Sequence, residues 1–554
     1  MKCVFLFILL FCSVFINAQI AEGTRVNAKL LFIKKDKTVN VKVELQFKVI
    51  SNDSLLIGNL RDYYGFPSLG KFMTELTGYN GTVVKKRGNA DSINIAPFNN
   101  EVNFTYTLGY DSATFSDATY APNVGENHVH FAFCQWMLPL TEKNKVLEYS
   151  IQVGNLPENW LLYSSVAGEA HDISFKGSLS EFFSATIGAG VFYKKPYTLK
   201  GKPLNVYING SFSTGNERLA ELGYKIVSYQ RTLFNDFQFS FYNVVLLPKE
   251  GNTAGISIPN MFLCLIKKDV DYQKLAWLMS HEMLHRWIGN QITIKDTTSF
   301  GLRHQWFKEG INDYLSYLVL LDSKLFTRDE FINSINSYIR NIKENPYSNA
   351  SEDSIKKVAA AGKYGVAATK LPYYKGGLIG FIADKEFLME SETGLHSRVK
   401  DFILTLLKNG KKIEGRIEPN EKMFFSFADS MQLPLYNLYQ KHIINGSADF
   451  DLPKKVFTGV YKLEKVKYQV YDLGFTFSEK DSKFFASSVD PYGPAYKAGI
   501  RNDMEIISST SVNRFSNAWC DCPVNMVVLV NGERKTVDYI PRGKEVQVLQ
   551  YIKK

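Results

Sequence analysis

The stretch Leu278–Trp287, which reads LMSHEMLHRW, decides how the centre of this chain folds. Its two histidines, His281 and His285, stand four positions apart, so on a helix they project from one face about one turn apart. Neutral imidazole suits zinc, and a site with three protein ligands keeps a fourth position open for water. Glu282 follows the first histidine at an angle that reaches this water rather than the metal. The apolar residues around the motif predict a buried helix over residues 272–288.

The next helical stretch supplies a third candidate ligand. We predict a helix over residues 306–321, which presents Glu309 with Asp313 one turn later. Asp313 is suited to accept the other ring N–H of a ligating histidine, which we assign to His281, and so to fix the tautomer of that ring. An unrelated pair of core or surface histidines explains His281 and His285 alone, but it does not explain the carboxylates in this second helix.

Strand patterns dominate the chain before this region, from residue 19 to about residue 200. The run Val39–Val49 alternates strictly between apolar and polar residues, which is the pattern of a half-buried strand. Similar aromatic and β-branched runs follow at residues 104–110 and 128–133. We therefore predict an N-terminal β-sandwich-like domain over residues 19–200.

Residues 201–450 have a mixed pattern that becomes mainly helical after Tyr272. Besides the two helices above and a buried strand over residues 237–247, we expect helices over residues 216–234, 328–343, 374–390, 396–408 and 420–431. Residues 445–455 are typical of a linker, and residues 460–554 return to short strands punctuated by glycine. The predicted fold class is therefore a multidomain α+β protein with a small, β-rich C-terminal domain.

The first 18 residues have the layout of a secretory signal peptide. Lys2 precedes the apolar run Val4–Ile16, and a small-residue site ends at Ala18. Cys12 raises a lipoprotein alternative, but Phe11 stands where lipid-modification sites need a small residue. The run is too short to span a bilayer, and no later stretch is long and apolar enough to do so. We expect an exported protein, periplasmic or secreted, without a transmembrane segment.

Composition narrows the possible classes of protein further. With 45% hydrophobic and 14% aromatic residues, the chain is neither disordered nor fibrous. The net charge of +10 is modest for 554 residues, and basic residues alternate with acidic ones, so we expect no nucleic-acid partner. The cysteines after residue 18 are too few for a disulfide framework, and the spacing of Cys520 and Cys522 fits neither a zinc knuckle nor a redox motif.

Residues 281–290 and Trp306–Gly310 together resemble the gluzincin metallopeptidases, in particular the aminopeptidase N family and the glycyl aminopeptidase family. This resemblance implies a thermolysin-like, mainly helical catalytic domain after an N-terminal β domain, one zinc ion per chain, and peptide or protein substrates. The interval from His285 to Glu309 is longer than is usual for aminopeptidase N, and it resembles the glycyl aminopeptidase branch. A loop over residues 295–304 would absorb the difference.

The segment Leu371–Gly377 resembles the Tyr-x-Lys-Gly motif of the same families, which implies that Tyr373 stabilises the oxyanion of the tetrahedral intermediate. Tyrosines that merely pack the start of a helix are the alternative. The predicted function is zinc-dependent hydrolysis of peptide bonds by a metal-activated water, with Glu282 as the general base.

The strand that precedes the metal helix departs from the family pattern. Gly255, Ile256 and Ser257 would bind an extended peptide through their backbone. The related aminopeptidases anchor the free substrate amine with a glutamate in this strand, but Ile258 stands at its place and Glu250 lies several positions too early. Loss of such a charge-assisted contact is worth roughly 1.5–3 kcal/mol. Exopeptidase and endopeptidase activity therefore both stay open.

The C-terminal part carries a second resemblance. Leu473, Gly474 and Phe475 resemble the carboxylate-binding loop of a PDZ domain, and residues 494–507 resemble the later helix-turn-strand segment. A PDZ domain is expected of the glycyl aminopeptidase family, and it implies a peptide ligand whose C-terminus is captured by backbone N–H groups. The alternative function is a catalytically inactive, PDZ-containing peptide-binding scaffold in which the metal site is a relic.

Overall fold

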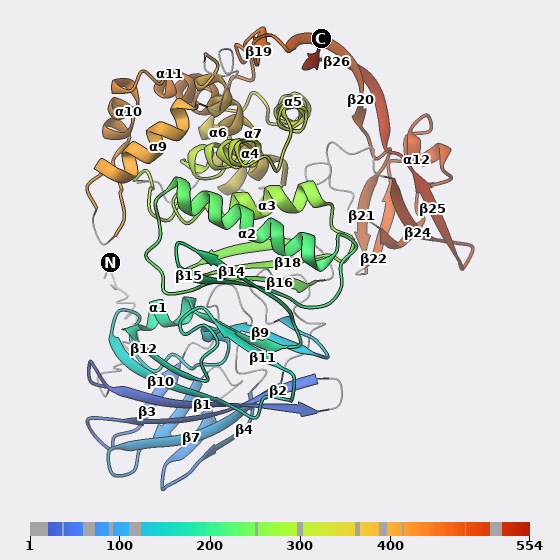
Figure 1. Cartoon of the computed structure of the whole chain (residues 1–554). Coiled ribbons are helices and arrows are strands. Elements are labelled where there is room, and N and C mark those ends of the chain that lie inside the picture. Colours follow the sequence, from blue (N-terminus) through green and yellow to red (C-terminus); the bar gives the residue numbers. More distant parts are fainter. Residues whose placement is uncertain are drawn as a thin grey trace, which may run out of the picture. The chain divides into compact units, whose positions relative to one another are not determined.

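In the computed structural model, the chain forms two compact units, Met1–Met283 and Leu284–Lys554; Figure 1 shows the whole chain. The boundary falls just before Leu284, the last residue of helix α3 (Tyr272–Leu284). The structure describes residues 20–35, 38–58, 73–87, 92–109, 123–249, 253–295, 303–360, 366–386, 396–412, 415–481, 483–509 and 523–554. The predicted leader over residues 1–18, Glu250, and both Cys520 and Cys522 lie outside these residues.

The first unit begins with β-sheets, as the alternating pattern predicts. The predicted strand over residues 39–49 is present as β2, and its apolar side chains from Val39 to Val49 are buried. A six-stranded sheet has the order β12-β10-β1-β2-β7-β4 and a four-stranded sheet the order β11-β13-β9-β8. One hydrophobic core contains side chains from both sheets, such as Leu45 and Phe131.

The strands of these two sheets are β1 (Arg25–Lys35), β2 (Thr38–Lys48), β4 (Met73–Gly78), β7 (Glu101–Leu108), β8 (Asn123–Val124), β9 (His128–Ala132), β10 (Val146–Gly154), β11 (Leu161–Ser164), β12 (Asp172–Ser178) and β13 (Thr186–Gly190). A three-stranded sheet, β3-β6-β5, is built from Leu55–Gly58, Ser92–Ala96 and Val83–Arg87. The short helix α1 (Leu179–Ser184) begins at a capping box in which Ser178 and Glu181 satisfy each other's backbone N–H groups.

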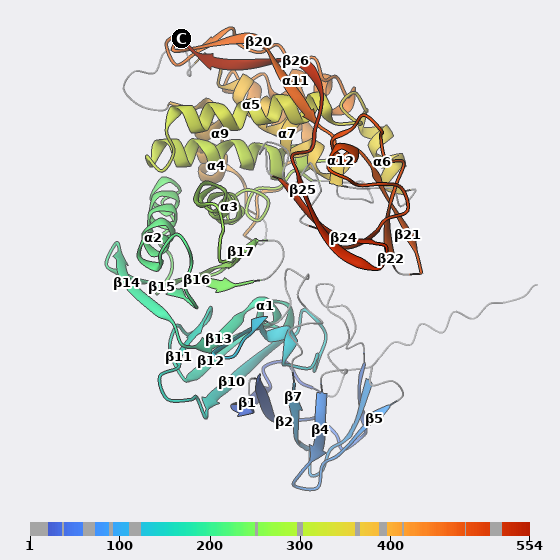
Figure 2. The same ribbon diagram turned by 90° about the vertical axis from the view of Figure 1, so that its right-hand side faces the viewer.

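The same unit continues into a five-stranded sheet of order β14-β15-β16-β18-β17. Its strands are β14 (Tyr193–Leu199), β15 (Lys202–Ile208), β16 (Tyr242–Pro248), β17 (Ala254–Ile258) and β18 (Met261–Ile266). The three central strands are parallel, and β14 and β17 are antiparallel edge strands. Helices α2 (Asn216–Leu233) and α3 (Tyr272–Leu284) cover one face of this sheet (Figures 1 and 2).

Two boundaries differ from the prediction in this region. The buried strand begins at Tyr242 rather than at residue 237. Helix α3 ends at Leu284, four residues before the predicted end, because the backbone turns toward Gly289, which adopts a φ of +93°. The N–H of Ile292 then donates to the carbonyl of Trp287, which closes this turn. His285 therefore lies just after the helix rather than inside it.

The second unit begins with helices. They are the π-helical segment η4 (Trp306–Ile311), α4 (Asn312–Asp322), α5 (Arg328–Glu344), α6 (Glu352–Ala360), α7 (Val366–Ala383), α9 (Arg398–Asn409), α10 (Glu421–Ser430), α11 (Leu435–Tyr439) and the π-helical segment η5 (Gln440–Ile444). The prediction missed α6, and it started α7 eight residues too late, because Pro372 inside a helix removes a hydrogen bond and normally ends the pattern. Tertiary packing of α7 overrides that local preference.

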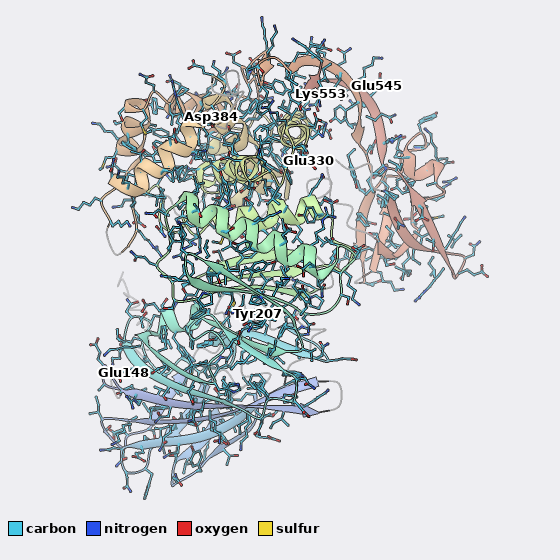
Figure 3. The ribbon with its side chains drawn as sticks, viewed as in Figure 1. Glu148, Tyr207, Glu330, Asp384, Glu545 and Lys553 are labelled. Atoms are coloured by element: carbon cyan, nitrogen blue, oxygen red, sulfur yellow. The ribbon has the colours of Figure 1, made fainter. Side chains whose placement is uncertain are left out.

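Helix α5 shows how closely sequence and structure agree where local signals are strong. Thr327 and Glu330 form a capping box at its start, with the Glu330 N–H donating to Thr327 Oγ1 at 3.2 Å. Figure 3 labels Glu330 together with Lys553, whose ammonium forms an ion pair with Asp329 at 3.0 Å. This second contact joins the first turn of α5 to the last strand of the chain.

The rest of the second unit is rich in β structure. Strands β20 (Tyr461–Tyr471) and β26 (Arg542–Lys553) form an antiparallel ribbon with the short β19 (Lys455–Val456), and this ribbon runs beside α5 in both ribbon views (Figures 1 and 2). In the sequence, the residues between β20 and β26 form a five-stranded sheet, β21-β22-β23-β24-β25, with its own small core. Its elements are β21 (Thr476–Lys480), β22 (Lys483–Ser487), α12 (Pro494–Lys497), β23 (Glu505–Ser509), β24 (Val524–Val530) and β25 (Glu533–Tyr539).

The architecture is therefore multidomain α+β, with a β-rich N-terminal part and a helical part. Within the described ranges, none of the helices has both the length and the apolar character needed to cross a membrane.

Candidate active site

The structure brings the three predicted metal ligands together. His281 lies in the last turn of α3, His285 one residue beyond its end, and Glu309 in η4. One possible ligand atom of each residue lies within 4.8 Å of the other two, and the Nε2 of His285 is 3.4 Å from a carboxylate oxygen of Glu309. His281 and Glu309 are 3% and 8% exposed, so these donors face each other away from bulk solvent.

The second ring nitrogen of His285 fixes its tautomer. Nδ1 lies 3.1 Å from the carbonyl oxygen of Ile288, and a carbonyl oxygen only accepts. In the neutral ring Nδ1 therefore carries the hydrogen, and Nε2, whose lone pair is then available to a metal, lies 3.4 Å from Glu309 Oε2. Two imidazole nitrogens and a carboxylate are a donor set that zinc accepts. Metal-bound histidines typically donate their other ring N–H to a carbonyl or carboxylate, as Nδ1 of His285 does here. The residues present fit a zinc ion.

Glu282 lies against the edge strand β17. A Cβ atom added to Gly255 would stand 3.0 Å from Cγ of Glu282, which is tighter than nine in ten real Cβ contacts. The lack of a side chain at Gly255 therefore makes room for the side chain of Glu282. Burial, and second the charge of Glu282, raise the pKa of the Cys264 thiol, which pairs with Gly255 across β17 and β18. The predicted base is thus held beside the strand predicted to bind substrate.

Strand β17 is the last strand of its sheet in the described part of the chain, and it pairs with β18 along Ala254–Ile258. Ile256 contacts the hydrophobic cluster beneath the sheet, and Ser257 Oγ lies 3.8 Å from the sulfur of Met283. Ile258 is buried in that cluster, so this position offers no carboxylate to a substrate amine. The other candidate anchor, Glu250, lies outside the described residues.

Helix α7 carries the two tyrosines of the Tyr-Tyr-Lys-Gly segment in different surroundings. Tyr373 is half-buried, with the ammonium of Lys370 4.0 Å from its ring centre. Tyr374 is 8% exposed and packs against Tyr338. Lys375 is buried and donates to the carbonyl oxygens of His442 and Gly446 at 2.9 and 2.8 Å, and burial lowers its pKa to about 8. Tyr373 is thus the tyrosine of the pair with a solvent-accessible side.

Two glycines bring this helix against η4. A Cβ on Gly376 would lie 2.1 Å from the carbonyl oxygen of Trp306, and one on Gly310 would lie 2.5 Å from the Cα of Gly376. The backbones of η4 and α7 therefore touch, which no other residue type permits at these two positions. The crossing lies next to Glu309 and three residues after Tyr373. Sequence analysis did not predict it, because a lone glycine gives no sign of what it packs against.

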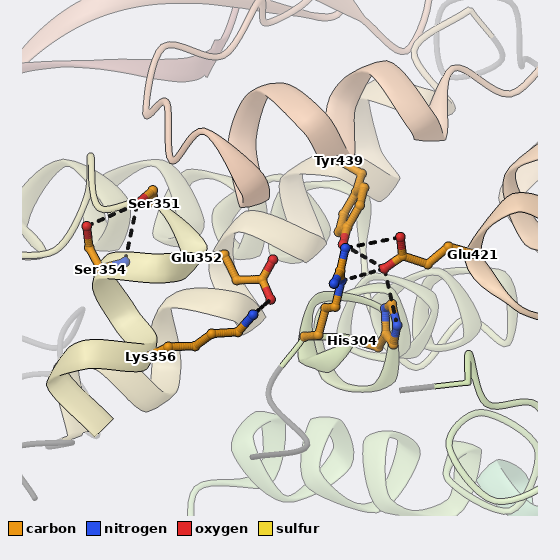
Figure 4. A network of polar contacts seen from close by, with 8 residues as sticks. His304, Ser351, Glu352, Ser354, Lys356, Glu421 and Tyr439 are labelled. Carbon is orange, nitrogen blue, oxygen red and sulfur yellow. Dashed lines mark hydrogen bonds and ion pairs between the residues drawn. The ribbon is translucent and has the colours of Figure 1, made fainter. Parts of the chain in front are cut away.

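A polar network holds the chain just before η4. Arg303 contacts Glu421 of α10 at 2.5 Å and the Tyr439 hydroxyl of α11 at 3.2 Å, and that hydroxyl in turn donates to Glu421 at 3.1 Å. His304 is buried with Nε2 3.6 Å from the same carboxylate (Figure 4). Because these contacts come from two separate helices, α10 and α11, they fix where the helix that carries Glu309 begins.

Asp313, the predicted partner of a ligand histidine, is 4% exposed in the turn after Glu309. Its Oδ2 accepts a hydrogen bond from the hydroxyl of Tyr338 at 2.6 Å. Sequence analysis missed Tyr338, which lies 25 positions away on α5 and carries no motif of its own.

The predicted carboxylate loop of the C-terminal part folds against α12. Gly474 has a φ of +78°, and a Cβ there would lie 3.0 Å from the backbone nitrogen of Ala495. Leu473 accepts from the Tyr539 hydroxyl through its carbonyl, and Phe475 is buried in the local core. The N–H of Gly474, one of the expected donors, bonds Oδ1 of Asp472 at 2.8 Å. The segment therefore turns at Gly474 against α12, and the Gly474 N–H is engaged by Asp472.

Comparisons with known proteins agree with this geometry. Residues 274–379 match the family model of the M61 glycyl aminopeptidases. That segment contains the three metal-ligand candidates, Glu282 and Tyr373. An aminopeptidase N family protein from Idiomarina loihiensis has a similar fold, with a TM-score of 0.65, 14% identity, and coverage of 95% of this chain and 98% of that chain.

Aminopeptidase M1-D from Oryza sativa subsp. japonica is 22% identical over 181 residues, which is 31% of this chain. The chain spans only 20% of the length of that relative. A peptidase-family segment thus coincides with the cluster of ligand candidates, and the fold of an aminopeptidase N family protein extends over nearly the whole chain.

Proposed function

We propose that this chain is a zinc-dependent peptidase that hydrolyses peptide bonds. The observation that carries the proposal is the convergence of one ligand atom each from His281, His285 and Glu309 within 4.8 Å, in a segment that matches a peptidase family. When bound by these residues, zinc would supply a Lewis acid that polarises the scissile carbonyl and acidifies the attacking water.

The residues of this chain supply the remaining steps. Glu282 takes the proton of the attacking water on a carboxylate oxygen and later delivers it to the leaving amine, first as a general base and then as a general acid. The hydroxyl of Tyr373 donates a hydrogen bond to the oxyanion that forms at the former carbonyl. The backbone of Gly255, Ile256 and Ser257 binds the substrate as an additional strand at the edge of the sheet. Asp313 orients a ligand histidine.

The decisive test is the pair of variants Glu282→Gln and Glu221→Gln. Glu282→Gln should retain one zinc per chain and lose about 10²–10⁴-fold in peptide hydrolysis, because the general base is absent. Glu221 is an exposed residue of α2 that pairs with Lys225, so Glu221→Gln is the matched control and should hydrolyse peptides normally. Full activity in Glu282→Gln would remove this residue from the mechanism.

Specificity follows from the amine anchor that is missing at Ile258. The chain resembles aminopeptidases, but β17 offers no carboxylate at Ile258 to bind the free amine of a substrate. A peptide with a blocked N-terminus should therefore bind at this strand as tightly as a free peptide. Cleavage of N-acetylated peptides at a rate comparable to free peptides would indicate an endopeptidase. Cleavage of free peptides alone would indicate an aminopeptidase that anchors the amine elsewhere.

Two further assignments belong to the same proposal. The chain is exported to the periplasm or beyond the cell after cleavage behind Ala18, and N-terminal sequencing of the mature protein tests this. The C-terminal β-rich part is a PDZ-like module that takes a peptide C-terminus at Leu473, Gly474 and Phe475, supported by the positive φ of Gly474 beside α12. A protein without stoichiometric zinc and without chelator-sensitive hydrolysis would instead be the inactive scaffold.

A further inference from the structure

Asp313, one helical turn after the proposed ligand Glu309, accepts a buried hydrogen bond. The hydroxyl of Tyr338 in α5 donates to Oδ2 of Asp313 at 2.6 Å, and the two residues are 3% and 4% exposed. Glu309 and Asp313 stand four positions apart, so they lie on one side of the continuous helix formed by η4 and α4. A carboxylate in such a position is costly to bury unless its oxygens accept hydrogen bonds.

The ring of Tyr338 has a fixed place. A Cβ on Gly377 of α7 would lie 2.5 Å from Cε2 of this ring, so the ring fills the space that the glycine leaves. The rings of Tyr317 and Tyr374 stand 6.0 and 6.3 Å away, centre to centre. The phenol is therefore packed on several sides, and its hydroxyl meets Asp313 in a single orientation. Burial, and next the charge of Asp313, raise the pKa of Tyr338, which keeps the hydroxyl protonated as a donor.

The helix that carries Tyr338 is held from its other side by the C-terminal strand. The side-chain amide of Asn336 exchanges two hydrogen bonds with the backbone of Tyr551, at 2.9 and 2.8 Å. Arg340 donates to the side-chain oxygen of Gln550 at 2.7 Å. These anchors lie two residues before and two residues after Tyr338, so the backbone that presents the phenol is fixed on both sides.

We propose that Tyr338 is a positioning residue for the metal site: its hydroxyl holds one oxygen of Asp313 and so fixes the direction in which the other oxygen accepts from a ligand imidazole. The inference rests on the proposed zinc site. Hydrogen bonds behind metal ligands commonly change metal affinity by about 10–100-fold when they are removed. Tyr338 would act one step further back, through Asp313, with its own position set by α7 and β26.

The test is zinc affinity, measured by competition with a chromogenic chelator on the folded, full-length protein. Tyr338→Phe keeps the ring and removes only the hydroxyl, and we expect zinc to bind about 10-fold more weakly. Tyr317→Phe is the matched control, because Tyr317 is buried in the same cluster with its ring 6.0 Å from that of Tyr338, while the hydroxyl that donates to Asp313 Oδ2 is that of Tyr338. It should cost a similar amount in the melting temperature of the metal-free protein and leave zinc affinity within about 2-fold.

A second variant keeps the test informative if Tyr338→Phe folds poorly. Asp313→Asn should weaken zinc binding, and adding Tyr338→Phe to it should weaken binding no further, because both changes break one chain of contacts. Wild-type affinity in Tyr338→Phe, or equal losses in Tyr338→Phe and Tyr317→Phe, would overturn the inference and leave the proposed function standing. A wild-type protein that binds no stoichiometric zinc would overturn both.

Discussion

The contact between η4 and α7 makes Gly376→Ala an informative perturbation. Alanine is the better helix former, and in a helix interior this exchange ordinarily stabilises by about 1 kcal/mol. Here the added Cβ would lie 2.1 Å from the carbonyl oxygen of Trp306, whereas real Cβ atoms essentially never come closer than 3.0 Å. The obstacle is backbone on the facing segment, so no side chain can rotate away to make room.

The required shift can be worked out from these distances. Moving the oxygen from 2.1 to 3.0 Å displaces η4 relative to α7 by at least about 0.9 Å (3.0 − 2.1). Overpacking costs typically about 1–3 kcal/mol. At the upper end of that range, less the gain in helix propensity, we expect a net loss of about 2 kcal/mol. Glu309 moves with η4, while zinc–ligand distances tolerate only about ±0.2 Å, so zinc should bind more weakly as well.

Calorimetry of the metal-free protein and chelator competition on the same samples measure the two effects. For a unit of this size, 2 kcal/mol corresponds to a decrease in Tm of about 3–4 °C. Gly109→Ala is the control, because its Cβ would meet only the side-chain oxygen of Asn40 at an ordinary 3.5 Å, and its stability should stay within about 0.5 kcal/mol of the wild type. A Gly376→Ala protein that melts higher than the wild type and binds zinc equally well would refute the backbone contact.

Three further outcomes are expected. Burial, and second the charge of His128, lower the pKa of His130 from 6.5 to about 3, so below pH 6.5 the unfolded chain binds a proton that the native state does not. The stability that this histidine contributes above pH 6.5 is therefore lost as the pH falls toward 3. His130→Gln should show a shallower fall in Tm between about pH 6.5 and 4.5 than the wild type. Asn336→Ala removes two hydrogen bonds to Tyr551 and should lower the free energy of unfolding by about 1–3 kcal/mol in urea titrations, and an unchanged value would contradict the contribution of these bonds. Zinc at 100 times its dissociation constant should stabilise the protein by about 2.7 kcal/mol, seen as a higher Tm than with chelator, and equal values would contradict a native zinc site.

Local periodicity accounts for the parts that the sequence predicted well. The spacing of His281 and His285 needs only one helical turn, and the turn after Leu284 preserves that neighbourhood although the helix ends early. The alternation over Val39–Val49 likewise depends on the two faces of a single strand, and the structure confirms it as β2. In each case the residues that give the pattern and the residues that form the structure lie within one short segment of the chain.

The parts that were missed depend on packing between distant segments. Nothing near Tyr338 in the sequence indicates that its hydroxyl meets Asp313, and Gly376 looks like any helical glycine until Gly310 is placed against it. Pro372 gave a misleading boundary for the same reason, because its local preference is overridden by the crossing of α7 with η4. Such contacts depend on which distant segments pack together, and the periodicity of a single segment does not contain that information.

The seating of β26 on α5 also has a consequence for how the chain matures. Asn336 and Tyr551 are 215 positions apart, so α5 leaves the ribosome well before its partner strand exists. At about 5–20 residues per second, translation leaves the strand-facing side of α5 uncovered for roughly 10–40 s. Helical segments can form within microseconds, which is short compared with this interval. The scaffold behind the proposed zinc ligands therefore cannot be complete before β26 has been synthesised, however early α5 forms.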